Sequence, residues 1–217
     1  MRVPRMLPAP AVAIVVALMT QVAPAHAAAV GAVLGVNRAG ISGDAPQNVE
    51  FGSQIGMIAG VQGEFGIARD VLLSMQPMFV RRGASIGDSD SLDDEPAQIA
   101  IDYFAIPVMV KIMAGGGRTY VTGGLDIAFL DAAKLSSATT ELDVTDFFTQ
   151  TDVAALVGFG VVFPIGRPKL TVEARYVQGL SSLAREDAIP PDQNLPDRFH
   201  NTGLQFTAGF LFPLGRP

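Results

Sequence analysis

Apolar side chains alternate with small or polar ones through much of the chain. Between 152 and 163, outward candidates such as Val157 and Phe159 alternate with Gly158 and Gly160, and the pattern resumes after a tight link at 166–169. Successive residues of a strand point to opposite sides of a sheet. Both segments are therefore predicted to be strands of a sheet with one apolar face and one mixed face.

The same alternation predicts eight strands, at 29–38, 54–66, 71–82, 99–113, 118–130, 152–165, 169–180 and 202–213. The connections alternate in length: those at 67–70, 114–117 and 166–168 are short, and those at 39–53, 83–98, 131–151 and 181–201 are long and polar. Pro164 and Pro213 are expected to mark strand ends, because proline cannot donate a ladder hydrogen bond. Short turns on one side and long loops on the other are typical of outer-membrane barrels.

The first 27 residues have the pattern of a cleaved signal peptide. Arg2 and Arg5 precede an apolar core at 11–19, and Ala25 and Ala27 fit a small-x-small cleavage site. The apolar core is too short for a spanning helix, which needs roughly 20 residues. We therefore expect an exported protein with one domain over 28–217. Losing both arginines from 15 basic residues would leave 13, against 21 acidic residues, which disfavours nucleic-acid binding.

The composition supports a membrane-embedded sheet. There is no cysteine, and after residue 27 no apolar run approaches the length of a spanning helix. An embedded chain without such helices must close its sheet into a barrel, because lipid cannot satisfy an open edge. The sequence therefore predicts an all-β protein, an eight-stranded antiparallel up-and-down transmembrane β-barrel with short periplasmic turns and long outer loops, located in the bacterial outer membrane.

A soluble barrel or sandwich with its apolar face inward is the main alternative. Charged residues, however, make up 17% of the chain and concentrate in the long connections. The mixed face carries many glycines, which suit a narrow interior: Gly31, Gly35, Gly56, Gly60, Gly124, Gly158, Gly160 and Gly209. Aromatic residues lie near strand ends on the apolar face, like the girdles of membrane barrels: Phe65, Phe79, Phe129, Phe163, Tyr176 and Phe212.

Several short motifs occur in a definite order along the chain. The most specific is 101–111, where Asp102 and Tyr103 precede Ile106 and Pro107 and the hydrophobic run ends at Lys111. The others are 31–37, 73–77, 120–124, 170–176 and 179–180. In this order the motifs resemble the PorT-like family of small outer-membrane β-barrels. The resemblance implies an eight-stranded outer-membrane barrel, in a family without one shared biochemical activity.

The alternation places seven ionisable side chains on the inner face: Glu64, Arg82, Lys111, Asp126, Asp152, Glu173 and Arg175. Buried charges are costly unless paired, so we expect ion pairs across neighbouring strands. An eight-stranded barrel is just filled by its own side chains. The favoured interpretation is a structural charge network that plugs the interior. A narrow path for ions or small solutes is the alternative.

Two other candidate sites are weaker. The acidic stretch 88–95 lacks the spacing of a calcium loop, so we expect a solvated surface loop there. His200 lies near Asp197, Ser181 and Ser182, but without a spacing known for nucleophilic catalysis. We therefore expect a non-enzymatic barrel that acts structurally or through its surface loops, with no catalytic, cofactor or metal site. Its expected partners are outer-membrane lipid and a protein or ligand at the loops, and a monomer is favoured. A narrow porin-like channel and a lipid-modifying enzyme are the alternatives.

Overall fold

The computed structural model describes residues 28–42, 49–88, 97–136, 141–145, 148–181 and 200–214. The expected signal peptide at 1–27 lies outside these residues, as does the acidic stretch after Asp88. Asp197 and Ser182 also lie outside them.

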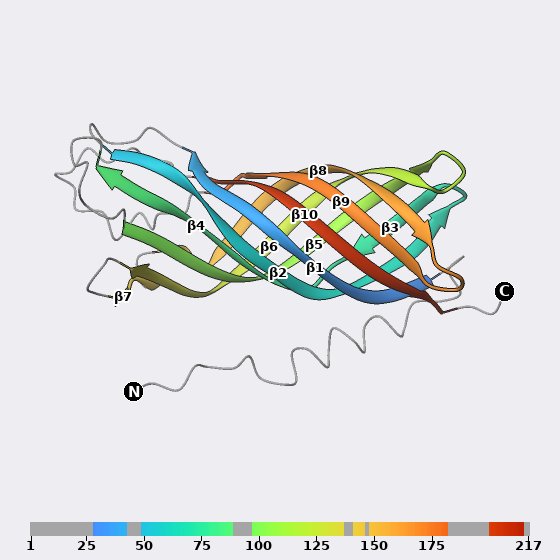
Figure 1. Ribbon diagram of the computed structural model, residues 1–217, viewed down its shortest axis with the longest axis horizontal. Coiled ribbons are helices and arrows are strands. Elements are labelled where there is room, and N and C mark those ends of the chain that lie inside the picture. Colours follow the sequence, from blue (N-terminus) through green and yellow to red (C-terminus); the bar gives the residue numbers. More distant parts are fainter. Residues whose placement is uncertain are drawn as a thin grey trace.

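The described chain is a single antiparallel sheet of ten labelled strands (Figure 1). These are β1 (Ala28–Ser42), β2 (Val49–Ala68), β3 (Val71–Met75), β4 (Met78–Asp88), β5 (Ala97–Ala114), β6 (Thr119–Ser136), β7 (Glu141–Asp143), β8 (Thr151–Pro164), β9 (Lys169–Gly179) and β10 (His200–Pro213). Strands β8 and β10 end at Pro164 and Pro213, as the sequence predicts.

The sheet closes into a ring because β1 pairs with β2 on one side and with β10 on the other. β3 and β4 together fill one place in the ring, since both pair with β2 and β5. Pro77 interrupts this strand, and hydrogen bonds repair the break on both sides: Val61 N to the Pro77 carbonyl and Gln76 N to the Pro107 carbonyl, each 3.0 Å. The predicted eight-stranded, up-and-down antiparallel ring is confirmed.

The structure corrects the predicted boundaries at the end of the ring that carries the long connections, here called the loop side. The strands run several residues farther there: β2 begins at Val49, β4 continues to Asp88 and β6 continues to Ser136. The short strand β7, inside the predicted 131–151 connection, pairs with the end of β6. The polar side chains in these segments did not end the strands. Ladder hydrogen bonds are made by the backbone, and they continue where a neighbouring strand is present.

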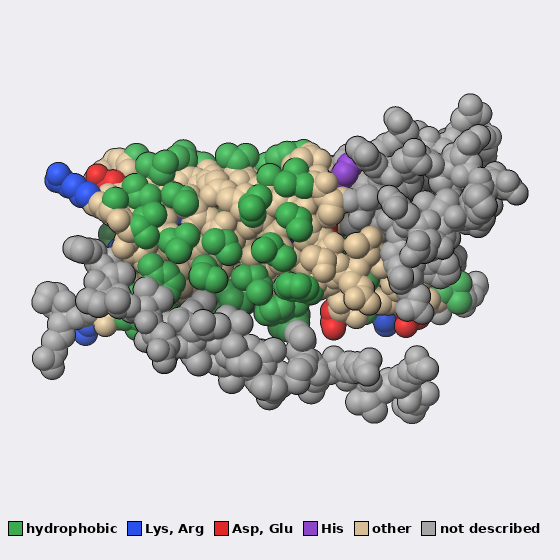
Figure 2. All heavy atoms as spheres, turned by 180° about the vertical axis from the view of Figure 1, so that it is seen from behind, with side chains coloured by type: hydrophobic (Ala, Val, Ile, Leu, Met, Phe, Trp, Pro, Cys, Tyr) green, Lys and Arg blue, Asp and Glu red, His purple; other side chains and the backbone are tan. Residues whose placement is uncertain are grey.

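The outer wall carries a belt without charge on every strand of the ring. Exposed Leu34, Phe159 and Phe206 are typical of this belt, and Figure 2 shows hydrophobic side chains over the wall between the two ends. On β6 the belt extends from Thr119 to Phe129, which matches the roughly 9–11 residues of a membrane-spanning strand. The part of the chain that the structure describes contains no helix with the length and hydrophobicity of a membrane span.

Most of the predicted aromatic girdle faces outward. Phe79, Phe129, Phe163, Tyr176 and Phe212 are about half exposed, whereas Phe65 is only 8% exposed. Phe65 lies between Ala28 of β1 and Leu73 of β3, next to a register shift after Gly66. Because the ladder stays in register from Gly63 to Gly66, Phe65 lies on the same side of β2 as exposed Val61, and its low exposure does not place it on the inner face.

Two glycines show how the narrow interior is filled. A Cβ on Gly160 would lie 2.2 Å from the Tyr120 ring, so glycine leaves the space that this ring occupies. A Cβ on Gly209 would lie 2.2 Å from the Gln62 side-chain nitrogen. Interior glycines therefore admit large polar side chains from neighbouring parts of the wall.

Candidate functional site: a charged barrel interior

The structure places all seven ionisable residues of the inner face inside the ring, each at most 7% exposed. They form two networks at different heights. We call Arg82, Asp126 and Asp152 the loop-side network. Glu64, Lys111, Glu173 and Arg175 form the turn-side network, named for the end where the short turns and both ends of the described chain lie.

In the loop-side network one guanidinium forms ion pairs with two carboxylates. Arg82 of β4 donates to Asp126 of β6 through one terminal nitrogen and to Asp152 of β8, at 3.0 Å, through the other. Its guanidinium also lies over the Tyr103 ring, 5.2 Å from the centroid. Both carboxylates are buried, so loss of the Arg82 guanidinium would leave their charges uncompensated. Such a loss is strongly destabilising.

Asp152 also holds both ends of the long connection between β9 and β10. Its Oδ1 accepts from the Ser181 hydroxyl at 2.6 Å, and its Oδ2 accepts from Asn201 Nδ2 at 2.8 Å. The Ser181 hydroxyl oxygen also accepts from Val153 N at 2.9 Å. The loop-side network is thus coupled to the base of the last outer connection.

The turn-side network spreads four charges over three strands. Lys111 Nζ lies 2.8 Å from Glu64 Oε1 and 3.3 Å from Glu173 Oε2. Arg175 Nε is 2.9 Å from Glu173 Oε1, an ion pair without hydrogen-bond alignment. Glu173 and Arg175 share a strand face because they are two residues apart. Two cations therefore balance two carboxylates here.

Neutral polar groups complete the turn-side network. The Tyr120 hydroxyl donates to Glu173 at 2.7 Å, and Lys111 Nζ lies 4.5 Å from the centroid of the Tyr120 ring. Arg175 donates to Gln76 Oε1 at 2.8 Å, and Gln76 in turn donates to Gln62 at 3.2 Å. These contacts join strands on opposite parts of the ring, as a plug across the interior requires.

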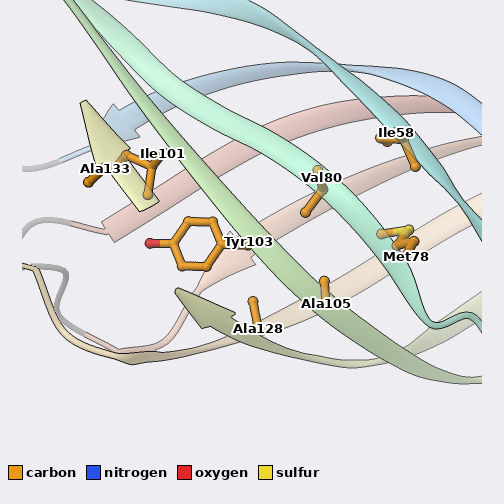
Figure 3. Packing of buried hydrophobic residues seen from close by; sticks show 8 residues of the cluster. All are labelled: Ile58, Met78, Val80, Ile101, Tyr103, Ala105, Ala128 and Ala133. Atoms are coloured by element: carbon orange, nitrogen blue, oxygen red, sulfur yellow. The ribbon is translucent and has the colours of Figure 1, made fainter. Parts of the chain in front are cut away.

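Apolar side chains fill interior space beside both networks. Figure 3 shows the larger cluster, which contains Tyr103 and seven other hydrophobic residues: Ile58, Met78, Val80, Ile101, Ala105, Ala128 and Ala133. A smaller cluster contains Met109, Ala154, Leu156 and Val177. Met109 contacts Arg175 of the turn-side network, and Ala154 pairs in register with Asp126 of the loop-side network. Apolar packing therefore lies between the two sets of charges.

The sequence interpretation missed the uncharged polar lining: Asn37, Gln62, Ser74, Gln76, Tyr120, Thr122, Thr171, Asn201, Gln205 and Thr207 are all buried. The signal was present in the same alternation. Tyr120 and Thr122 share a face with Asp126, and Gln62 shares one with Glu64. Charge alone therefore gave an incomplete list of the interior.

The chemistry available to this interior is mainly charge pairing. Among the described residues there is no group of three or more histidine, cysteine, aspartate or glutamate side chains arranged to hold a metal ion. His200 Nδ1 contacts the backbone carbonyl of Ser181, at 2.9 Å, while the Ser181 hydroxyl is bonded to Asp152. A nucleophile needs its hydroxyl directed at the base, and this arrangement directs it at a carboxylate instead.

A solved structure with a TM-score above 0.5 supports the fold. The chain is similar to the outer membrane protein OprG from Pseudomonas aeruginosa, with 10% identity, a TM-score of 0.54 and coverage of 88% of this chain and 97% of that one. It also matches Ail of Yersinia pestis in complex with the heparin analogue sucrose octasulfate, with 13% identity, a TM-score of 0.46 and coverage of 86% and 100%. Neisserial surface protein A matches with 12% identity, a TM-score of 0.45 and coverage of 85% and 97%.

No curated protein matches the chain. The family model described as "Outer membrane protein beta-barrel domain" matches residues 19–185. The narrower resemblance to PorT-like barrels stays a prediction. The charge-free outer belt, the closed ring and this match agree: the chain belongs to the outer membrane protein beta-barrel domain family.

Proposed function

We propose that this protein is a non-enzymatic outer-membrane barrel whose interior is closed by its own side chains. It acts as a structural element of the membrane or through binding at its outer loops. The observation that carries the proposal is the pair of buried networks, in which Arg82, Lys111 and Arg175 reach carboxylates on other strands or on their own.

The networks oppose solute passage for an energetic reason. A hydrated ion that passed Lys111 or Arg82 would have to displace a buried partner and leave a charge uncompensated. The apolar cluster of Met109, Ala154, Leu156 and Val177 adds side chains that cannot solvate the ion. A small barrel of this strand number has no spare width to bypass these side chains.

The non-enzymatic part of the proposal is supported by the geometry at the loop-side rim. Ser181 and His200 meet through a backbone carbonyl, and the Ser181 hydroxyl is committed to Asp152 and Val153. A lipid-modifying reaction would require this hydroxyl to leave a buried carboxylate before it reached a base. The surface loops are therefore the favoured place for any binding partner.

A narrow channel is the second candidate, because the inner wall is lined by polar as well as apolar groups. Asn37, Thr122 and Gln205 are buried on the inner face without belonging to either charged network. Such groups could solvate a small ion if the networks rearranged. The channel hypothesis therefore predicts conduction that depends on breaking the ion pairs.

Planar-bilayer recording separates the two functions. We expect the folded protein, verified by its altered electrophoretic migration before boiling, to insert without stable conductance steps. Arg175→Ala should lower the unfolding temperature and leave conductance nearly unchanged, because Lys111 still compensates Glu173. A large, stable conductance from the unaltered protein would refute the closed interior and favour the channel.

A further inference from the structure

A groove of about 580 Å³ opens on the outer wall where β2, β4, β5 and β6 pass one another. Its lining combines apolar and charged side chains, including Ile55, Met57, Phe79, Arg81, Asp102 and Asp131. These side chains belong to the outer face, whereas Val80 and Tyr103, which also border the groove, are buried residues of the inner face.

Two strand irregularities explain why the wall is hollowed here. Residues 54–57 of β2 face only 81–83 of β4, so β2 carries an extra residue at this point. Asp131 is an extra residue of β6 opposite the step from Asp102 to Tyr103. Bulges of this kind increase local twist and redirect side chains, and they often occur beside functional sites. Asn37 Nδ2 donates to the Arg81 carbonyl at 3.1 Å and so stabilises the first irregularity.

The polar end of the groove has charges of both signs. Arg81 binds Asp102 in bidentate fashion, with Nε and Nη2 at 2.7 and 3.0 Å from the two carboxylate oxygens. Nη1 takes no part in this pair. Asp131 adds a second carboxylate to the same groove. The groove thus offers a guanidinium donor for an anionic group next to carboxylates that favour a cationic group.

The apolar end belongs to the hydrocarbon-facing belt. Ile55 and Met57 are about three-quarters exposed, and Phe79 is half exposed. On β4 and β5 the belt ends at Arg81 and Asp102, the first charged outward residues on the loop side. Met57 lies beside Arg81 in the register between β2 and β4, and Phe79 lies two residues farther toward the turn side, so the groove extends from the level of the charged residues into the belt.

We propose that this groove binds one zwitterionic phospholipid, of the phosphatidylethanolamine type. Its phosphate binds Arg81, its ammonium lies against Asp102 and Asp131, and an acyl chain packs on Met57 and Phe79. A purely anionic head group fits less well, because one cation faces two carboxylates. The inference requires lipid around the outer wall but does not depend on whether the interior is closed.

Native mass spectrometry of the full chain in neutral detergent tests the proposal. Phosphatidylethanolamine, anionic phosphatidylglycerol and lipid A with or without Mg²⁺ are added separately. We expect one retained phosphatidylethanolamine, bound about tenfold more tightly than phosphatidylglycerol, since a charged hydrogen bond contributes roughly that factor. Arg81→Gln should lower phosphatidylethanolamine affinity about tenfold, whereas Arg118→Gln, in an exposed turn at the other end, should not.

Asp131→Asn provides a second, independent test. It removes a carboxylate but keeps Arg81, so it should reduce the preference for phosphatidylethanolamine over phosphatidylglycerol. Asp70→Asn, in the exposed turn between β2 and β3, is the matched control. Equal binding of the two phospholipids by the unaltered protein would overturn the proposal, as would equal effects of Arg81→Gln and Arg118→Gln. Stronger Mg²⁺-dependent binding of lipid A would also overturn it and identify the other source of phosphate.

Discussion

The two ionic networks inside the barrel differ in how their charges are shared. In the loop-side network Arg82 alone compensates Asp126 and Asp152, and an excess carboxylate remains. In the turn-side network Lys111 and Arg175 both contact Glu173, and Lys111 also compensates Glu64. The loop-side network therefore depends on Arg82 alone for its positive charge. In the turn-side network, Glu173 has two cationic partners, Lys111 and Arg175.

The networks also differ in their connections to the rest of the molecule. Asp152 accepts hydrogen bonds from Ser181 and Asn201, which lie at the two ends of the last long connection. In the turn-side network, Glu173 accepts a hydrogen bond from Tyr120, and Arg175 donates one to Gln76. Both partners belong to the wall of the barrel. The comparison suggests that the loop-side network holds the two described ends of the last long connection and that the turn-side network holds the wall together.

The largest effect is expected from Arg82→Met. This change leaves two buried carboxylates without a cation, and breaking a buried pair in this way costs about 3–5 kcal/mol. Urea unfolding in lipid vesicles, followed by electrophoretic migration, measures the loss. Arg81→Met, on the outer face of the same strand, is the control and should have a much smaller effect because Arg81 is exposed.

Lys111→Met should lower the free energy of unfolding by about 3 kcal/mol or slightly less. This loss is smaller than the one expected for Arg82→Met. Glu173 keeps Arg175 and Tyr120 as partners, so only Glu64 loses its cation in this network. Adding Glu64→Gln to Lys111→Met should recover much of the loss. If the double variant were less stable than Lys111→Met alone, the assigned pairing would be wrong.

Gly160→Ala should cost about 2 kcal/mol, because the added methyl group collides with the Tyr120 ring and displaces its hydroxyl from Glu173. Gly123→Ala is the matched control, since its Cβ would meet only the Leu156 carbonyl, at 3.7 Å. The same unfolding measurement applies. Equal losses for the two variants would contradict the packing role of Gly160.

Ser181→Ala should have the smallest global effect, about 1 kcal/mol, because Asp152 keeps Arg82 and Asn201. Its main consequence should be local. Hydrogen exchange should increase at Val153 and around Ser181, where the hydroxyl now accepts from Val153 N. Unchanged exchange there would show that the hydroxyl does not hold the base of the loop.

The sequence was sufficient to predict the strands and their inner faces because a period of two residues is explicit in the chain. That period placed Glu173 and Arg175 inside and Val157 and Phe159 outside. It did not predict which charges pair, because Arg82 and Asp152 come from strands 70 residues apart in the chain. Such partners depend on strand tilt and register, which no local pattern specifies.

The outer groove was equally inaccessible to sequence reasoning. Arg81 and Asp102 are identifiable as charged residues, but their outward pairing depends on the register between β4 and β5. The extra residues in β2 and β6 become visible only when each strand is aligned with its neighbours. The break at Pro77 was likewise hidden within a segment that alternates like a single strand.

Cysteine labelling in proteoliposomes tests the central claim most directly, because the chain has no cysteine of its own. Val157→Cys on the outer wall should react with a lipid-soluble thiol reagent but not with a water-soluble maleimide. Thr207→Cys inside the ring should react with neither until the protein is unfolded, and Arg167→Cys in a turn should react with the maleimide. Rapid maleimide labelling of the folded Val157→Cys or Thr207→Cys variant would contradict, respectively, the lipid-facing wall or the closed interior.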